Sequence, residues 1–201
     1  MQRSHDRLIF LHGFLGSPQD WEGVIGYLPE FQCEALIYPF QIPSNGILIG
    51  YSMGGRIALR YSHRKIVFST HPGLTTPEEK AARRFHDQQW LDLLERVSLE
   101  EFLKAWYQQP LFRSLKLDSA LFQRRISQSR ETIAQMLIGE SLADQSFSTD
   151  ATFVYGELDT KFAEIYQAHA IKAFQLAGVG HACHLENPQL VAEFIQTFCR
   201  G

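Results

Sequence analysis

One serine lies between two glycines, in Gly50-Tyr51-Ser52-Met53-Gly54, where an apolar run ends and a helical pattern begins. A G-x-S-x-G turn between a strand and a helix holds its serine in a strained backbone conformation with the hydroxyl outward. Glycines suit positions 50 and 54, because side chains there would collide with the neighbouring strand or helix. A helix N-terminus also favours negative charge. We therefore predict that Ser52 is a nucleophile or base; a plain strand–helix turn is the alternative.

A reactive serine needs a base, and the base needs an acid that orients it. In α/β hydrolases the three follow in the order serine, acid, histidine. The predicted strand ending in "VYGELD" offers Asp159 as the acid, with Glu157 as the alternative. After the last predicted strand, "GHACH" offers His181 as the base, with His184 as the alternative. These candidates follow strand ends, where open parallel sheets bind their ligands.

The first predicted strand ends in "LHGF", which would bring backbone N–H groups beside the serine. We predict an oxyanion hole formed by the N–H groups of Phe14 and Met53, each such donor contributing roughly 2.7–4 kcal/mol to transition-state stabilisation. His12, within the same stretch, is expected to have a structural role.

A metal site is a further interpretation of "GHACH". His181, Cys183 and His184 are close enough in sequence to chelate zinc, but no second cluster of ligands accompanies them. We therefore expect neither a metal nor an organic cofactor.

Length and composition limit the possible functions. The 201 residues, 45% of them hydrophobic, suffice for one domain with its own core. A net charge of −3 argues against nucleic-acid binding, which needs a basic excess. Three irregularly spaced cysteines favour a reducing compartment. The apolar run near the N-terminus is too short for a secretory signal, and no run of about 18 apolar residues exists, so we expect a cytoplasmic protein without a membrane anchor.

Hydrophobic patterning predicts an α/β fold. Short apolar runs bounded by turn residues are typical of buried strands, and their alternation with amphipathic helical patterns indicates a parallel sheet. The predicted strands are 8–13, 34–39, 46–52, 65–70, 151–159 and 172–178. The predicted helices around them are 18–28, 53–62, 163–170 and 187–199.

The middle third of the chain has a different pattern. Helix starts occur in "TTPEEK" and in "SLEEF", the second a capping box, and one amphipathic helix is predicted over 118–137. No strand signal interrupts them. We predict that residues 75–148 form an all-helical insertion, which we call the cap, within a single domain of residues 1–201.

Arginine is abundant near the predicted site. Arg56 lies one turn into the helix that follows the serine, and guanidinium groups are suited to bidentate binding of carboxylates. The cap supplies further arginines, for each of which a solvated surface charge is the alternative: Arg83, Arg84, Arg113, Arg124, Arg125 and Arg130.

Six stretches together carry a family resemblance: "FLHGFLGSPQDW", "GYSMGGRIAL", "HPGLTTPEEKAARR", "WYQQPLF", "GELDTKF" and "GHACHLENP". On these stretches the chain, from about residue 8 to its end, resembles the 2-succinyl-6-hydroxy-2,4-cyclohexadiene-1-carboxylate synthase family of menaquinone biosynthesis. The pair "HPGL…EEKAAR" and "WYQQPLF" is the most specific, because general hydrolases lack it. The resemblance implies an α/β-hydrolase fold.

The resemblance also implies an activity. Family members are lyases that eliminate pyruvate from 2-succinyl-5-enolpyruvyl-6-hydroxy-3-cyclohexene-1-carboxylate, a small polycarboxylate, without a cofactor. By resemblance, Ser52 acts with His181 and Asp159 to remove a ring proton. The implied substrate-binding residues are Arg56, Arg83, Arg125, Trp106 and Tyr107. Arg124, next to Arg125, is the less favoured match.

The chain departs from the family between residues 39 and 46, where relatives carry a glycine-rich turn and a whole helix. Here "FQIPSN" fills the gap, although a parallel crossover usually needs about a dozen residues or more. We expect a shortened fold that lacks this crossover helix and any strand before residue 8. The sheet face left bare would be covered by a second copy in a homo-oligomer, or the domain would be less stable than its relatives.

Two other functions stay open on the residues alone. A serine hydrolase of a small ester, thioester or C–C bond would use the same three catalytic groups and form an acyl-enzyme. A non-catalytic binding module would keep its role after loss of Ser52, but would leave the serine–acid–histidine set unexplained.

Overall fold

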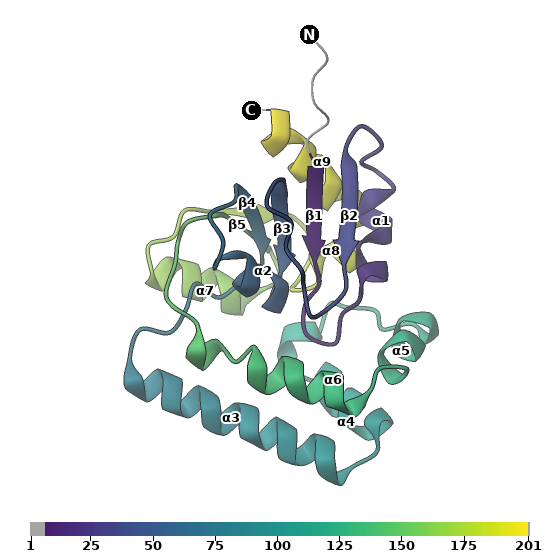
Figure 1. Ribbon diagram of the computed structural model, residues 1–201, viewed down its shortest axis with the longest axis vertical. Helices are drawn as coiled ribbons and strands as arrows, with labels where there is room; N and C mark the ends of the chain where they lie inside the picture. The colour runs from purple at the N-terminus through teal and green to yellow at the C-terminus, as the bar shows by residue number, and fades with distance from the viewer. Residues whose placement is uncertain (1–6, 201) are drawn as a thin grey trace.

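A six-stranded sheet forms the centre of the molecule in the computed structural model, which describes residues 7–200 (Figure 1). Its strands are β1 (Arg7–Leu11), β2 (Gln32–Leu36), β3 (Ile47–Tyr51), β4 (Lys65–Phe68), β5 (Thr152–Gly156) and β6 (Ala173–Leu176). The spatial order is β2-β1-β3-β4-β5-β6, and every neighbouring pair is parallel. The predicted fold class, an α/β-hydrolase-type sheet with helices on its faces, is confirmed.

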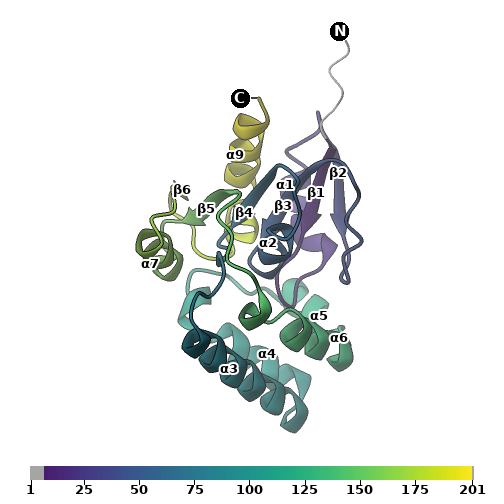
Figure 2. The ribbon, with the colours of Figure 1, turned by 60° about the vertical axis from the view of Figure 1, so that its left-hand side comes forward.

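Helices cover both faces of the sheet (Figures 1 and 2). One face packs against α1 (Glu22–Ile25), α8 (Cys183–Glu186) and α9 (Pro188–Arg200). The other face packs against α2 (Met53–Ala58) and α7 (Thr160–Ala168). The predicted helix over 18–28 is wrong in form, because the chain makes a 3₁₀ turn at Pro18–Trp21 before the short α1.

The cap lies beyond the carboxyl ends of the strands (Figure 1). Its helices are α3 (Pro77–Arg96), α4 (Leu99–Tyr107), α5 (Ser119–Ile126) and α6 (Arg130–Ala134), with short turns at Pro110–Phe112, Gln135–Gly139 and Leu142–Asp144. The predicted starts of α3 and α4 are confirmed, since Thr76 and Ser98 each form a capping box. These helices carry the cap side chains toward the sheet edge at which the candidate catalytic residues lie.

The single helix predicted over 118–137 is wrong, because the chain breaks between α5 and α6. Ser129 accepts a hydrogen bond from the backbone of Thr132 and starts a new helix. Gln128 turns inward and its side-chain nitrogen donates to the carbonyl of Leu15, 2.6 Å away. A contact between residues so far apart in sequence overrides a continuous amphipathic pattern.

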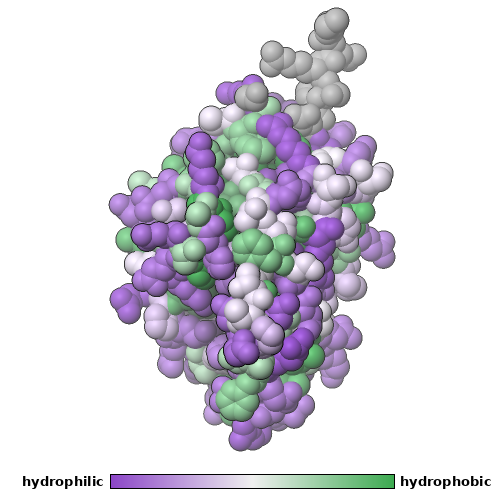
Figure 3. All heavy atoms as spheres, turned by 90° about the vertical axis from the view of Figure 1, so that its left-hand side faces the viewer, coloured by the Kyte–Doolittle hydropathy of each residue, from purple (hydrophilic) through white to green (hydrophobic). Residues whose placement is uncertain are grey.

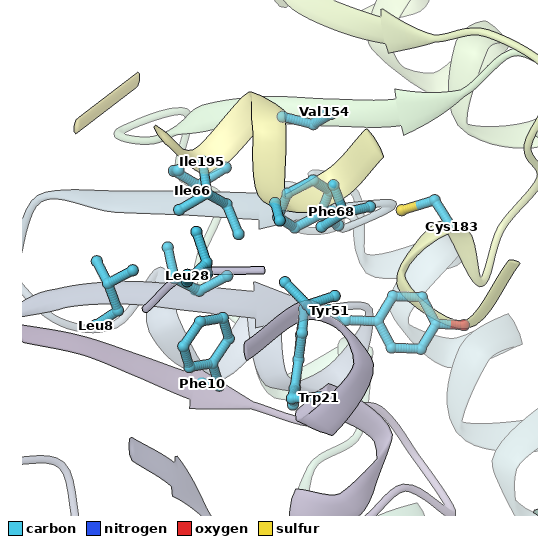
Figure 4. Close-up of a cluster of buried hydrophobic side chains, with 14 of the residues drawn as sticks. Leu8, Phe10, Trp21, Leu28, Tyr51, Ile66, Phe68, Val154, Cys183 and Ile195 are labelled. Atoms are coloured by element: carbon cyan, nitrogen blue, oxygen red, sulfur yellow. The ribbon is translucent and has the colours of Figure 1, made fainter. Parts of the chain in front are cut away.

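The strands alternate their side chains between two apolar layers. Leu8 and Phe10 of β1 face α1 and α9, whereas Ile9 and Leu11 face α2 and α7, and all four are fully buried. Figure 4 shows the first layer, where Leu8, Phe10 and Trp21 lie among residues of β3, β4 and α9. Burial on both faces explains why these strands are continuous apolar runs.

The connection between β2 and β3 contains no helix, as predicted. Phe40 and Ile42 of this connection pack against the apolar layer on the α2 side, and Ile9 and Leu48 beneath them are fully buried. The bare face that the short connection predicts is therefore largely filled within one chain. Among the large hydrophobic residues of this connection, Ile37 is the exposed one, with 73% of its surface accessible. The homo-oligomer stays a prediction.

No helix among residues 7–200 is long and apolar enough to cross a membrane. On the face shown in Figure 3, apolar residues form separate groups among hydrophilic ones. This side of the molecule carries no continuous apolar surface.

Helix α2 starts in close contact with β1. A Cβ atom at Gly54 would lie 2.3 Å from the carbonyl oxygen of Leu11 and 2.5 Å from that of His12. At Gly50 a Cβ atom would lie 2.5 Å from the Cα atom of Gly55. Backbone, not flexible side chain, fills both spaces, so only glycine fits.

Two histidines lie in the core near this junction. The His12 Nδ1 lies 2.8 Å from the carbonyl oxygen of Gly13, and its burial lowers its pKa to about 4. The His184 ring packs 4.6 Å from Trp21 and 4.3 Å from Tyr51, between ring centroids. Neither nitrogen of His184 has a hydrogen-bond partner among residues 7–200, and burial lowers its pKa to about 3. Both rings are neutral in the folded protein near pH 7.

We predict that Gly54→Ala destabilises the protein by roughly 1–3 kcal/mol, because the backbone must move to admit the methyl group. Urea unfolding followed by circular dichroism measures the change. Gly26→Ala is the matched control, since a Cβ there meets its nearest atom at 3.5 Å and the backbone φ is −58°. We expect the control to be neutral or stabilising by about 0.4–1 kcal/mol. Equal stability of the two variants would contradict the close packing.

We predict that His184→Phe makes the protein less sensitive to acid. The unfolded histidine takes up a proton below its ordinary pKa of 6.5, whereas burial keeps the folded ring neutral down to about pH 3. The contribution of the neutral His184 to the free energy of unfolding is fully present above pH 6.5, the pKa of the unfolded histidine. Below that pH the contribution decreases, by up to about 1.4 kcal/mol per pH unit. Unfolding free energies measured at several pH values between neutrality and about pH 4 should fall less steeply in the variant. An unchanged slope would show that His184 is not a neutral core residue.

Candidate active site

Ser52 sits at the junction of β3 and α2 with a φ of 50° and a ψ of −108°. This φ is unusual for a residue with a side chain, and the surrounding backbone holds it. The backbone nitrogen of Ser52 donates to the carbonyl of Phe68, 2.9 Å away, and its carbonyl accepts from the backbone nitrogen of Arg56 at 3.0 Å. The hydroxyl has no hydrogen-bond partner among the described residues. It is therefore available to a molecule in the cavity that it lines.

His181 and Asp159 form the pair that the strand ends predict. The His181 Nδ1 lies 2.8 Å from the Asp159 Oδ2, and both side chains are almost completely buried. Because a carboxylate only accepts, Nδ1 carries the proton, and Nε2 is left as the acceptor. The other oxygen of Asp159 accepts from the backbone nitrogen of Phe162, 3.4 Å away. His181 lines the same cavity as Ser52.

Glu157 and His184, the alternative acid and base, lie outside the cavity. Glu157 is exposed and accepts a hydrogen bond from the backbone of Gly178, away from His181. His184 lies in the core between aromatic rings and does not line the cavity. Of the four candidates, Asp159 and His181 are the carboxylate and the histidine that contact each other.

The cavity has two lobes that meet at Ser52 and His181. The first lobe, about 60 Å³, extends toward Tyr107 and Arg125. The second lobe, about 130 Å³, extends toward Arg56 and Arg83. Phe14, Trp106 and Leu111 line both lobes. A molecule bound at the serine can thus project groups in two directions.

Arginine charge in the second lobe is only partly neutralised by the chain. Arg83 pairs through Nε with Asp87 at 2.7 Å. Arg56 is 8% exposed and donates to the carbonyl oxygen of Glu140 at 2.6 Å, while the Glu140 carboxylate pairs with Arg60. Burial, together with the charges of Arg83 and Arg60, lowers the pKa of Arg56 to about 9. An anion in this lobe would relieve that repulsion.

Arg125 dominates the first lobe. Its Nη2 donates to Asp20 at 2.6 Å and its Nε donates to the hydroxyl of Tyr107 at 3.0 Å. Its Nη1 is buried and has no hydrogen-bond partner among the described residues. An unpartnered buried guanidinium donor is costly, so this nitrogen suits a ligand acceptor. Arg124 is less buried than Arg125, with its side chain 38% exposed and its Nη2 3.7 Å from the Asp20 Oδ1, and it lines neither lobe.

The two expected oxyanion donors lie beside the serine. Phe14 follows β1 and lines both lobes, and Met53 is the first residue of α2 and lines the second. Within residues 7–200 no acceptor is recorded for the backbone N–H of either residue. The oxyanion hole formed by these two N–H groups stays a prediction.

Of the cap residues singled out from the sequence, some lie outside the cavity. Arg84 forms an exposed ion pair with Asp144. Arg130 donates to the carbonyls of Leu94 and Val97 and so ties α6 to the end of α3. Arg113 is exposed and lines neither lobe.

Three basic side chains of the second lobe, His71, His86 and Lys161, were missed by the sequence analysis. Burial and the charge of Arg56 lower the pKa of His71 to about 4, so this ring is neutral near pH 7. His71 follows β4 and Lys161 follows Asp159, so the strand-end rule that identified the triad could have included both.

The metal interpretation has no structural support in the part of the chain described. His181 is paired with Asp159, whereas Cys183 and His184 are buried in the core. Burial raises the pKa of the Cys183 thiol, which disfavours the thiolate that a metal needs. No group of three or more potential ligands is arranged for a metal within residues 7–200.

Comparison with known proteins places this geometry in a family. Residues 11–194 match the model of the alpha/beta hydrolase family. The solved structure of MenH from S. aureus superposes with a TM-score of 0.83 at 24% identity, over 97% of this chain and 93% of that chain. At this identity the match shows a shared fold.

Sequence relatives are more specific. A Haemophilus influenzae protein, provisionally named a 2-succinyl-6-hydroxy-2,4-cyclohexadiene-1-carboxylate synthase, is 35% identical over 235 residues, covering 94% of this chain and 95% of its own. The enzyme of that name from Enterobacter sp. is 31% identical over 235 residues, covering 96% and 91%. Both alignments extend over 235 positions, more than the 201 residues of this chain, so they contain gaps opposite residues of the relatives. The chain therefore belongs to the 2-succinyl-6-hydroxy-2,4-cyclohexadiene-1-carboxylate synthase family of α/β-hydrolase enzymes.

Proposed function

We propose that the protein eliminates pyruvate from 2-succinyl-5-enolpyruvyl-6-hydroxy-3-cyclohexene-1-carboxylate and releases 2-succinyl-6-hydroxy-2,4-cyclohexadiene-1-carboxylate. The observation that carries this proposal is a serine between two lobes, each of which holds a buried arginine without a full set of carboxylate partners. The substrate bears carboxylates on its ring, its succinyl arm and its enolpyruvyl arm. A cavity with cations on both sides of the reactive group suits such a molecule.

The reaction begins with removal of a proton. The ring carbon that carries the succinyl group is next to a ketone, so its proton is acidic. Ser52 takes this proton while His181 Nε2 accepts the hydroxyl proton, and Asp159 stabilises the histidine that becomes positively charged. General base catalysis of this kind contributes roughly 10²–10⁴-fold to the rate.

The electron pair then moves through the ring. Loss of the proton forms an enolate whose oxygen would accept hydrogen bonds from the Phe14 and Met53 N–H groups. The enolate electrons form a double bond at the succinyl-bearing carbon, the ring double bond shifts by one position, and the C–O bond to the enolpyruvyl group breaks. The leaving group departs as pyruvate enolate and takes up a proton to become pyruvate. The ring is left as a diene, and no water is consumed.

The arginines set the orientation of the substrate. Arg56 and Arg83 in one lobe and Arg125 in the other would bind carboxylates, while Trp106 and Tyr107 form the apolar wall above the ring. A rigid guanidinium can bind a carboxylate through two parallel hydrogen bonds, which fixes direction as well as affinity. The ring proton is thereby presented to Ser52.

We predict that Ser52→Ala lowers the rate of pyruvate release from the enolpyruvyl substrate by roughly 10²–10⁴-fold, because the base is removed. Pyruvate is followed by its reduction with NADH and lactate dehydrogenase. Ser62→Ala, at an exposed serine beyond the end of α2, is the control and should retain wild-type activity. An active Ser52→Ala enzyme would contradict the mechanism. A wild type that is inactive here but is acylated at Ser52 by activated esters would instead be a hydrolase.

We predict that Arg83→Gln lowers kcat/KM by roughly ten- to a hundredfold, in line with the loss of a hydrogen bond to a charged group. Arg84→Gln is a matched control, because the neighbouring side chain is 57% exposed and paired with Asp144 on the surface. The control should change kcat/KM less than about twofold. If both substitutions lowered kcat/KM equally, the net positive charge of the cap, and not the position of Arg83 in the cavity, would account for substrate binding.

A further inference from the structure

A third cavity opens on the outer side of the second lobe. This outer pocket, about 230 Å³, lies between the turn that starts at Pro110 and the loop that leads into α7. It shares three lining residues, Gln109, Leu111 and Lys161, with the second lobe. The outer pocket and the second lobe are therefore adjacent, with these three residues at their common border.

Lys161 is the one cation among the residues that line the outer pocket. Asp159, the one anion there, is committed to His181 and to the backbone of Phe162. The remaining lining residues are neutral, and Leu158 among them is 55% exposed. Because the two partners of Asp159 hold its carboxylate, Lys161 is the side chain of this pocket whose charge an entering anion can pair with.

The ammonium group of Lys161 is not engaged by the protein. The side chain is exposed, and within residues 7–200 it has neither a hydrogen bond nor an ion pair. Partial desolvation at the cavity wall and the charge of Arg83 lower its pKa, while Asp159 opposes the shift. Within the described residues, all three donors of the ammonium group are free to meet an anion.

Exposure decreases from Lys161 toward the serine. Lys161 is exposed, the Arg83 side chain is 30% exposed, and Arg56 is 8% exposed. A carboxylate that moves from Lys161 to Arg83 and then to Arg56 has a cation beside it at each step, while it gradually loses its hydration water. Desolvation of a charge costs several kcal/mol when it occurs without a partner, so staged pairing lowers the barrier to entry.

We propose that the outer pocket is the entry port for the carboxylate-bearing substrate, and that Lys161 captures the leading carboxylate and passes it to Arg83 and Arg56. The inference rests on the proposed function for the identity of the substrate. Lys161 borders both the port and the second lobe, so its charge acts on the carboxylate during entry and after binding. Lys161 is a binding and positioning residue and takes no part in proton transfer.

The kinetic test compares Lys161→Gln and Lys161→Glu with the wild type. At low ionic strength we expect kcat/KM to fall about tenfold in the first variant and further in the second, because a cation that attracts the substrate is lost or reversed. The difference should shrink as salt is added, and kcat should stay within about twofold. Lys172→Gln, which removes an exposed lysine that lines none of these cavities, is the control. Wild-type kcat/KM and salt dependence in both Lys161 variants, or a loss confined to kcat, would overturn the proposal.

A second readout does not depend on the reaction. Acetic anhydride labelling of the wild type, followed by mass spectrometry, should show that succinate protects Lys161 but not Lys172. Protection in an enzyme that releases no pyruvate would support the port and reject the proposed reaction. Pyruvate release with unprotected Lys161 would support the reaction and reject the port.

Discussion

The backbone of Ser52 is the constraint on which the site depends. Its φ of 50° is tolerated because β3 enters and α2 leaves the same point, with Phe68 and Arg56 bonded to its main chain. That geometry requires α2 to approach β1 so closely that no side chain fits at Gly54. Phe14, which follows β1, lines the same cavity as the serine. The strained backbone of Ser52 thus belongs to the same close junction of β1, β3 and α2 that excludes a side chain at Gly54.

The arginines that line the cavity around Ser52 are only partly paired with carboxylates of the folded chain. Asp20 and Asp87 neutralise part of Arg125 and Arg83, and Arg56 finds only a carbonyl. A fully paired set would bind no anion, and an unpaired buried set would destabilise the fold. Partial pairing keeps these buried guanidinium groups compatible with the fold and still leaves donors for an anion, such as the Nη1 of Arg125.

The short connection between β2 and β3 shows that the sheet can keep its order without a crossover helix at this position. A crossover helix normally covers the sheet there, yet Phe40 and Ile42 of an extended segment fill the space over Ile9 and Leu48. The loss falls between β2 and β3, on the part of the sheet away from β5 and β6, which Asp159 and His181 follow. The contact between His181 and Asp159 does not depend on that helix, because the loops after β5 and β6 hold both residues.

The sequence by itself determined the strands, the elbow and the kinds of group that follow each strand end, because these depend on short-range periodicity and local turn chemistry. Only the tertiary structure decided between His181 and His184. The two residues are three positions apart, yet the ring of His181 contacts Asp159 and the ring of His184 packs in the core against Tyr51. It also decided that Arg125 enters the cavity and that a helix breaks at Gln128. Such outcomes follow from contacts between distant segments, for which a local pattern carries no information.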